Sequence, residues 1–215
     1  RSDGAGSQLI RDYVVVLRAG GSGPGPGGGN KSGTMNRVYV TGGNGFLGSS
    51  VVAGLAGASD QVELIVSADI RPPAGDRVID GVIYEIADVT DAATVSEQIA
   101  EHRIDTVVHL AAIPAPGLHS DVATCRNNQL ATVNVLHAAT RLGITKVVMA
   151  SSETVLGLPF DTPPPYIPVD EEYAARPESV YSLGKHLEET MAVELCRWHP
   201  ALSITALRFS TGMDV

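Results

Sequence analysis

The residues that could do chemistry include a phenol and an ammonium four residues apart, Tyr181 and Lys185. On a helix this spacing puts both side chains on one face, one turn from each other. A cation so placed stabilises a phenolate, which makes Tyr181 a candidate general acid/base near neutral pH. Ser151 and Ser152 follow a strand pattern upstream, and a hydroxyl there could hold a substrate oxygen while Tyr181 moves the proton. Taken alone, a Tyr-x-x-x-Lys spacing can also arise by chance on an amphipathic helix.

A glycine-rich turn has the spacing of a phosphate-binding loop. The run 41–48 (TGGNGFLG) follows directly on a strand pattern and leads into a helical pattern. Gly42 allows the tight turn, Gly45 lets the backbone approach a pyrophosphate, and Gly48 lets helix and strand pack closely. The N–H groups at the start of the helix would bind the anion. Without further support, such a turn could equally be a simple loop.

Asp69 strengthens the interpretation as a dinucleotide site. It ends the second strand pattern, where a carboxylate can accept hydrogen bonds from both hydroxyls of an adenosine ribose. The alternative is a solvated acid at a strand end. The charge of Asp69 would repel a 2′-phosphate, so NAD is the expected cofactor and NADP is less favoured, although Arg71 nearby could offset part of that repulsion.

A parallel sheet is needed to bring these residues together. Short runs rich in β-branched residues alternate with helical patterns, and such apolar runs suit strands buried on both faces. The order predicts an α/β fold with a doubly wound, Rossmann-like parallel sheet and right-handed crossovers. The segment 71–81 is polar and rich in Pro and Gly, so we expect no helix there. The predicted strands cover residues 38–40, 64–68, 82–86, 106–110, 146–150 and 204–208, and the predicted helices cover 46–56, 94–101, 127–142 and 179–198.

The composition argues against several classes of protein. The 215 residues carry a formal charge of −9, which repels a phosphate backbone, so nucleic-acid binding is not expected. Cys125 and Cys196 lie far apart without zinc-type spacing, and we expect neither a metal site nor a disulfide framework. His109 makes no metal spacing either and is expected to be a strand-end residue beside the cofactor. No aliphatic run approaches the roughly 20 residues needed to cross a bilayer, so we expect a soluble, cytoplasmic protein.

The first 34 residues differ in composition from the rest. Ten of them are Gly, and the stretch 20–33 (GGSGPGPGGGNKSG) has no apolar periodicity. We therefore expect residues 1–34 to be a flexible N-terminal extension outside the fold. Residues 35–215 are expected to form the cofactor-binding domain that carries Tyr181 and Lys185.

From residue 35 to the end, the chain resembles the extended short-chain dehydrogenases/reductases, which include NAD-dependent epimerases and dehydratases of nucleotide sugars. TGGNGFLG at 41–48 is similar to the family's TGxxGFxG loop, and HLAA at 109–112 is similar to its fourth-strand motif. NQLATVN at 128–134 resembles NxxGTxN, with Ala131 where Gly is usual. SSETVLG at 151–157 resembles SSxxVYG.

Single residues outside these motifs also match the family's pattern. Tyr181 and Lys185 are similar to the YxxxK pair, and Glu189 falls on the acidic position that commonly follows it. Asp88 resembles the adenine-contacting Asp after the third strand. The resemblance implies a catalytic set of Ser152, Tyr181, Lys185 and Asn128. It implies cofactor contacts from Gly42, Gly45, Phe46, Leu47, Gly48, Asp69, Asp88, Val89, Leu110, Ala111, Ala112, Tyr181 and Lys185, with Lys185 on the nicotinamide ribose.

The resemblance also bears on the reaction and the partners. It implies hydride transfer with NAD at a hydroxyl carbon of a sugar or nucleotide sugar, in a homodimer. Leu156 stands where the family usually has an aromatic residue, which argues against a typical sugar-epimerase pocket. Dehydratases of the family carry an adjacent Asp-Glu pair after the Ser/Thr, and only Glu153 could contribute here, so dehydration is disfavoured. Because the chain ends after the sixth strand pattern, we expect the C-terminal substrate domain to be largely absent. A sugar or uronate dehydrogenase that releases NADH and a non-catalytic dinucleotide-binding protein stay open as alternatives.

Overall fold

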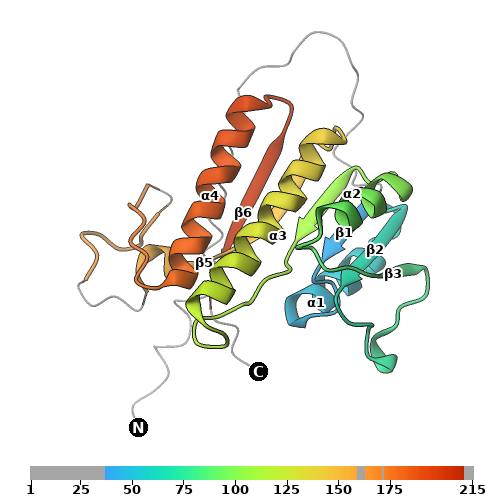
Figure 1. Cartoon of the computed structure of the whole chain (residues 1–215), viewed down its shortest axis with the longest axis horizontal. Helices are drawn as coiled ribbons and strands as arrows, with labels where there is room; N and C mark the ends of the chain where they lie inside the picture. Colours follow the sequence, from blue (N-terminus) through green and yellow to red (C-terminus); the bar gives the residue numbers. More distant parts are fainter. Residues whose placement is uncertain (1–36, 159–162, 171, 211–215) are drawn as a thin grey trace.

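The computed structural model describes residues 37–158, 163–170 and 172–210 (Figure 1). The predicted extension 1–34 lies outside the described residues. Within them, strands alternate with helices along the chain, in the order that the hydrophobic pattern predicts.

Six strands form one parallel sheet in the order β3-β2-β1-β4-β5-β6. Chain order and sheet order reverse beside β1, which pairs with β2 on one side and with β4 on the other. This is the strand order of a doubly wound dinucleotide-binding sheet, and the loops at this reversal form the crevice in which such sheets bind their ligands. The predicted fold class is confirmed. The strands are β1 (Arg37–Thr41), β2 (Leu64–Asp69), β3 (Val82–Ile86), β4 (Thr106–His109), β5 (Lys146–Ser152) and β6 (Ser203–Phe209).

The helices largely follow the prediction. They are α1 (Phe46–Gly57), α2 (Ala92–Glu101), α3 (Asp121–Arg141) and α4 (Val180–Trp198). The crossover from β2 to β3 holds only the single 3-10 turn η1 (Gly75–Arg77), as the Pro/Gly-rich sequence indicates. No described helix is long and apolar enough to cross a membrane.

Helix α3 begins six residues before the predicted start at residue 127. Ser120 caps it, because its side chain accepts a hydrogen bond from the Ala123 N–H. The first turns present mostly polar or exposed residues, so hydrophobic periodicity does not reveal them. The extra turns include Thr124, which is buried.

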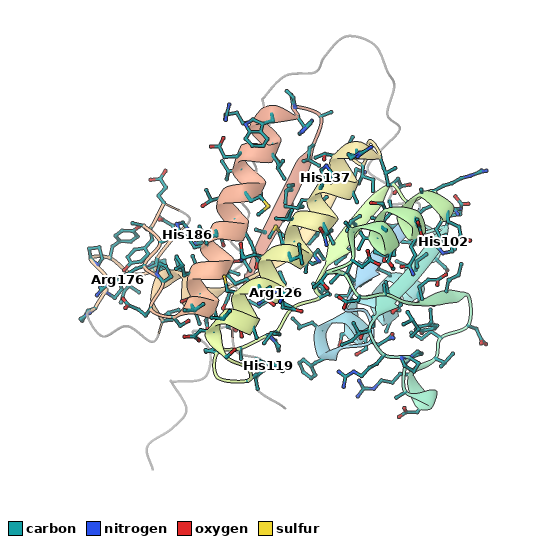
Figure 2. All side chains as sticks on the ribbon, in the orientation of Figure 1. His102, His119, Arg126, His137, Arg176 and His186 are labelled. Carbon is teal, nitrogen blue, oxygen red and sulfur yellow. The ribbon has the colours of Figure 1, made fainter. Side chains whose placement is uncertain are left out.

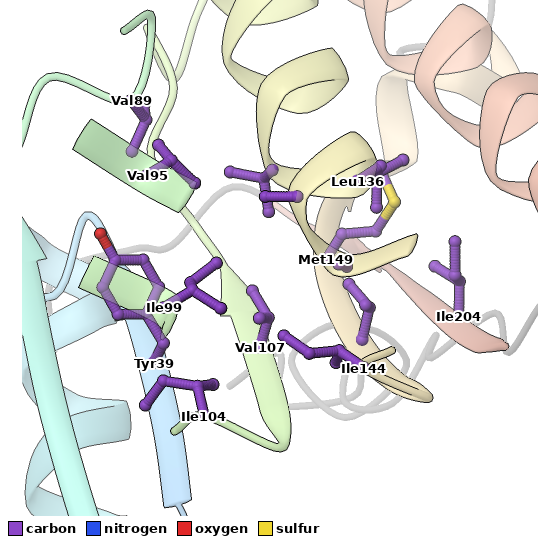
Figure 3. Close-up of a cluster of buried hydrophobic side chains, with 14 of the residues drawn as sticks. Tyr39, Val89, Val95, Ile99, Ile104, Val107, Leu136, Ile144, Met149 and Ile204 are labelled. Carbon is purple, nitrogen blue, oxygen red and sulfur yellow. The ribbon is translucent and has the colours of Figure 1, made fainter. Parts of the chain in front are cut away.

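The sheet is covered on both faces, with a separate core on each. Val38 and Val40 of β1 pack with Val52 of α1 on one face. Tyr39 points the other way, into the larger core that the sheet shares with α2, α3 and α4 (Figure 3). The alternation follows from the period of two along a strand. Figure 1 shows α3 and α4 side by side, with α4 packed against β5 and β6 and α3 against β4.

Candidate active site

The glycine-rich turn after β1 is built from close backbone contacts. Gly42 has a φ of 68°, and its N–H donates to the Ala68 C=O at 2.7 Å. A Cβ on Gly42 would lie 2.8 Å from the Ala111 Cα, so the turn after β1 sits directly against the segment after β4. Only glycine combines this left-handed backbone with so close an approach. The structure therefore joins two of the predicted cofactor segments at the point where the strand order reverses.

The start of α1 offers main-chain donors to an anion. Gly45 is the N-cap and has no side chain to cap the helix, and the first turn carries no acidic residue. The Phe46 side chain is 66% exposed, which leaves the approach to this turn open. A Cβ on Gly48 would lie 2.0 Å from the Gly42 C=O, so the turn and the helix are in contact. This geometry fits a pyrophosphate.

The carboxylate of Asp69 lies beside the same turn. Its two oxygens accept hydrogen bonds from the Asn44 and Arg71 N–H groups, each at 3.2 Å. The Asn44 side chain is held in turn, since it accepts from the Ser67 hydroxyl at 2.9 Å and donates to the Arg71 C=O at 2.7 Å. Asp69 is half-buried and fixed at the end of β2, where a ribose diol would meet both the carboxylate and the turn.

The residues after β3 are placed differently from one another. Asp88 is exposed, and its Oδ1 accepts hydrogen bonds from the Thr90 N–H and hydroxyl at 2.9 and 2.7 Å. The Val89 side chain belongs to the larger core, while its C=O accepts from the Asn134 side chain at 3.1 Å. Any contact of Val89 with a cofactor would therefore come from its backbone. The adenine contact of Asp88 stays a prediction.

The end of β4 is tied to the end of β1. The Thr41 hydroxyl accepts from the Leu110 and Ala111 N–H groups at 3.2 Å each, and it contacts the His109 Nδ1 at 2.7 Å. His109 is buried, and its Nε2 contacts the Thr132 hydroxyl at 3.1 Å. Burial, aided by the positive charge of Lys185, lowers the pKa of His109 to about 3, so its ring is neutral. It lies at the strand end, as expected.

Asn128 fixes the segment that follows Leu110, Ala111 and Ala112. Its Oδ1 accepts from the Ile113 N–H at 2.8 Å, and its Nδ2 donates to the Ile113 C=O at 3.0 Å. Both polar atoms of the amide are thus engaged with one backbone position. Asn128 holds the loop beside the candidate site, and its catalytic role stays a prediction.

Besides Asn128 of α3, the predicted catalytic side chains come from two neighbouring elements, β5 and α4. Ser152 ends β5, and its hydroxyl contacts the Thr154 Oγ1 at 2.9 Å. Tyr181 lies in the first turn of α4, which begins with a capping box between Ser179 and Ser182. Both Ser152 and Tyr181 are buried, at 8% and 9% exposure. Helix α4 packs against β5 and the short turn after it, so the two side chains belong to the same end of the molecule.

Lys185 stands one turn after Tyr181, and its ammonium is already engaged by the protein. The Nζ donates to the Ala150 C=O at 2.9 Å and to the Glu188 Oε2 at 3.0 Å. An ammonium has three donors, so one is left for a substrate or a cofactor ribose. The lysine side chain is only 5% exposed.

Sequence reasoning missed two charged partners at this site. Glu188 was not singled out, although it follows Lys185 by three residues and so shares its helix face. Arg208 was also missed, and its guanidinium makes two hydrogen bonds of 2.8 Å to Glu189. The Ser151 hydroxyl donates to the same carboxylate. The helix spacing could have revealed Glu188, whereas the pairing with Arg208 depends on how β6 lies against α4.

Other ionisable side chains lie on the same two helices. Figure 2 shows Arg126 and His137 on α3 and His186 on α4. Among the described residues no three His, Cys, Asp or Glu side chains form a metal-binding group. Cys125 and Cys196 are both free thiols.

Comparison with known proteins identifies what this arrangement is similar to. The sequence model of the NAD dependent epimerase/dehydratase family matches residues 38–213. UDP-glucose 4-epimerase of Drosophila melanogaster is 31% identical over 191 residues, which cover 80% of this chain and 52% of that protein. The chain thus spans about half the length of the relatives that it matches.

Two solved structures are similar to the chain in fold. UDP-glucose 4-epimerase from Thermus thermophilus in complex with NAD has a TM-score of 0.67 at 27% identity, covering 80% of this chain and 54% of that one. A mutated uronate dehydrogenase has a TM-score of 0.65 at 25% identity, covering 79% of this chain and 57% of that one.

Proposed function

The chain belongs to the NAD-dependent epimerase/dehydratase family, and we propose that it is the cofactor-binding and proton-transfer part of an enzyme that oxidises a hydroxyl carbon of a sugar or nucleotide sugar. The observation that carries this proposal is the placement of Tyr181 and Lys185. They lie one turn apart on α4, at the end of the sheet that also holds the glycine-rich turn. The groups proposed for proton transfer and for anion binding thus lie at the same end of the sheet.

The side chains divide the chemistry between them. Tyr181 takes the proton from the substrate hydroxyl while a hydride leaves the carbon that bears this hydroxyl, and the carbon becomes a carbonyl. In the reverse step the proton and the hydride return to the substrate. Ser152 donates a hydrogen bond to the reacting oxygen, while the Lys185 ammonium favours the phenolate form of Tyr181. NAD, when bound, supplies the acceptor for the hydride. The turn 42–48 and Asp69 hold its pyrophosphate and adenosine ribose.

Two outcomes of this chemistry are distinguished by the fate of the hydride. An epimerase returns the hydride to its substrate, whereas a sugar or uronate dehydrogenase releases NADH. Similarity to UDP-glucose 4-epimerases over 80% of the chain favours the first and a nucleotide-sugar substrate. The fold of a uronate dehydrogenase is similar as well. Growth of NADH absorbance during turnover would identify the dehydrogenase.

Tyr181→Phe tests the proposal in the enzyme that contains this chain, screened with NAD against sugars and nucleotide sugars. The ring still packs but the transferable proton is lost, so turnover should fall on the order of hundredfold or more. NAD affinity should stay nearly unchanged. Tyr39→Phe is the control, because its hydroxyl bonds to Gln98 in the core. Normal turnover in Tyr181→Phe would favour a protein that binds the dinucleotide without catalysis.

The predicted homodimer draws support from the outer faces of α3 and α4. These helices expose apolar side chains, including Val122 at 78% on α3. Exposed apolar surface of this kind favours association. The large exposed apolar residues of the two helices are Val122, Leu130, Val133, Leu183, Leu187, Val193 and Trp198. Light scattering of the purified protein would give the mass, and a cytoplasmic location stays a prediction.

A further inference from the structure

The most deeply buried charge in the molecule's described part belongs to Glu188, which has no place in the proposed mechanism so far. Its side chain has 0% exposure and forms an ion pair with Lys185, whose side chain is 5% exposed. Burying two charges together costs several kcal/mol per ion unless the geometry is good and the remaining lone pairs are satisfied. The surroundings of Glu188 show how these conditions are met.

Three donors from two helices converge on the Glu188 carboxylate. Lys185 donates to Oε2 at 3.0 Å, and the Gln129 side chain donates to Oε1 at 3.2 Å. The Thr132 hydroxyl makes a further hydrogen bond to the carboxylate. Gln129 is itself fixed by a hydrogen bond to the Gly184 C=O at 2.9 Å. A site with donors only is built to hold a carboxylate in its ionised form.

The donor and acceptor roles in the hydrogen bonds that lead to Thr132 agree with an ionised Glu188 carboxylate. The Thr41 oxygen accepts from two backbone N–H groups, so its own proton is directed to the His109 Nδ1. The neutral His109 then carries its proton on Nε2 and donates it to Thr132. This leaves the Thr132 proton for Glu188. The chain of hydrogen bonds runs in one direction and ends on the carboxylate.

We propose that Glu188 is a positioning residue that holds the Lys185 ammonium and neutralises part of its charge, so that Lys185 stabilises the Tyr181 phenolate less than an unpaired lysine would. The placement of the groups supports this. Glu188 and the Ala150 C=O occupy two of the three lysine donors, and one donor remains. The proposal rests on the proposed function, because it concerns the same acid/base pair.

The other charges near Glu188 are balanced. Burial raises the pKa of Glu188, and the negative charge of Glu189 acts in the same direction. The charge of Lys185 and the hydrogen bonds to the carboxylate oppose this rise. Glu189 is itself paired with Arg208 of β6. His109 of β4 is neutral, and α3 contributes only the uncharged Gln129 and Thr132. Lys185 is therefore the charge that Glu188 acts on most directly.

The test is the pH titration of Tyr181 in the full chain without cofactor. The phenolate absorbance is measured in each protein and corrected with the matching Tyr181→Phe protein. In Glu188→Gln the midpoint of Tyr181 ionisation should move to lower pH by about one unit. The lysine charge is no longer offset, while the amide oxygen of Gln and the Ala150 C=O still accept from the ammonium and keep it protonated. Glu188→Met should move the midpoint in the same direction but by less, because only the Ala150 C=O then remains as an acceptor. Glu194→Gln, an exposed position on the same helix, should leave it unchanged.

A double variant shows whether the effect passes through Lys185. In Lys185→Met the buried carboxylate loses its cation and takes up a proton, so adding Glu188→Gln should then shift the midpoint no further. Three results would overturn the proposal. The first is a midpoint that stays unmoved or rises in the single Glu188 variants, and the second is an equal shift in the Lys185→Met background. The third is unfolding of both Glu188 variants. Calorimetry with NAD on the parent chain is run separately. Failure to bind NAD would count against the proposed function and not against this inference.

Discussion

The two halves of the sheet contribute different kinds of chemical groups to the candidate site. The half around β1, β2 and β3 uses backbone: the turn 42–48 relies on glycines in close contact, and its donors are main-chain N–H groups. The half around β4, β5 and β6 uses charged side chains buried in pairs, Lys185 with Glu188 and Glu189 with Arg208. Adding a side-chain atom to a glycine should therefore impair the first half. Removing one charge of a buried ion pair should impair the second half.

Under the proposed function the two halves have different tasks. A pyrophosphate carries its own charge, and short-range N–H donors at a helix start are enough to bind it. Proton transfer needs a side chain whose charge is controlled, and burial makes every charge near it count more. The pairs Lys185–Glu188 and Glu189–Arg208 balance the charges that α4 carries into buried positions.

The largest effect should come from Glu189→Gln in the charged half. Arg208 would be left buried without its partner, and one of its terminal nitrogens already has no hydrogen bond. We expect the free energy of unfolding to fall by about 3–5 kcal/mol. Glu194→Gln, which breaks an exposed pair with Arg197 on the same helix, should cost less than about 1 kcal/mol. Urea unfolding of the two variants measures both, and equal losses would remove the distinction between buried and exposed pairs.

In the backbone half, Gly48→Ala should have the next largest effect. The added Cβ would lie 2.0 Å from the Gly42 C=O, so the turn must move away from the helix. We expect NAD affinity to fall on the order of hundredfold, as for a displacement of about 1 Å in a preorganised site. Gly54→Ala in the same helix meets nothing within 4 Å and should stabilise the protein by roughly 0.5–1 kcal/mol. Calorimetry with NAD and thermal melts give the two values, and unchanged affinity in Gly48→Ala would contradict the account of the turn.

His109 joins the two halves, because it contacts Thr41 of β1 and Thr132 of α3. Its pKa is lowered to about 3, whereas the unfolded chain takes up this proton near pH 6.5. Stability should therefore fall as the pH falls through this window, by about 2 kcal/mol from pH 7 to pH 5. His109→Gln should lose this contribution to the pH dependence, and His137→Gln, an exposed control on α3, should keep it. Equal slopes for His109→Gln and the parent in urea unfolding at both pH values would show that His109 is not buried as a neutral ring.

Much of the backbone half could be predicted from the sequence because its signals are local. Its three strands, like those of the other half, were expected from runs of β-branched residues, and the turn 41–48 was found from glycine spacing. The missing helix between β2 and β3 was also expected, from Pro and Gly in the segment 71–81. These features depend on a few consecutive residues, and tertiary contacts only reinforce them.

The charged half was harder to predict because its contacts join distant segments. The first turns of α3 carry few apolar positions, so their helical structure left no periodic signal. Glu189 was expected as an acid near Lys185, but its pairing with Arg208 requires β6 to lie beside β5 and under α4. Asn128 was assigned to the site, and only the structure reveals that its amide holds the Ile113 backbone.

Calorimetry of Asp69→Ala shows whether the turn after β1 and Asp69 together bind NAD. Loss of the carboxylate should weaken NAD binding about tenfold, because the ribose diol loses its charged acceptors. NADP binding should weaken less or improve, since the repulsion of its 2′-phosphate is gone. Asp60→Ala, an exposed acid after α1, should change neither affinity. Equal losses for NAD and NADP, or no NAD binding by the parent chain, would contradict the account.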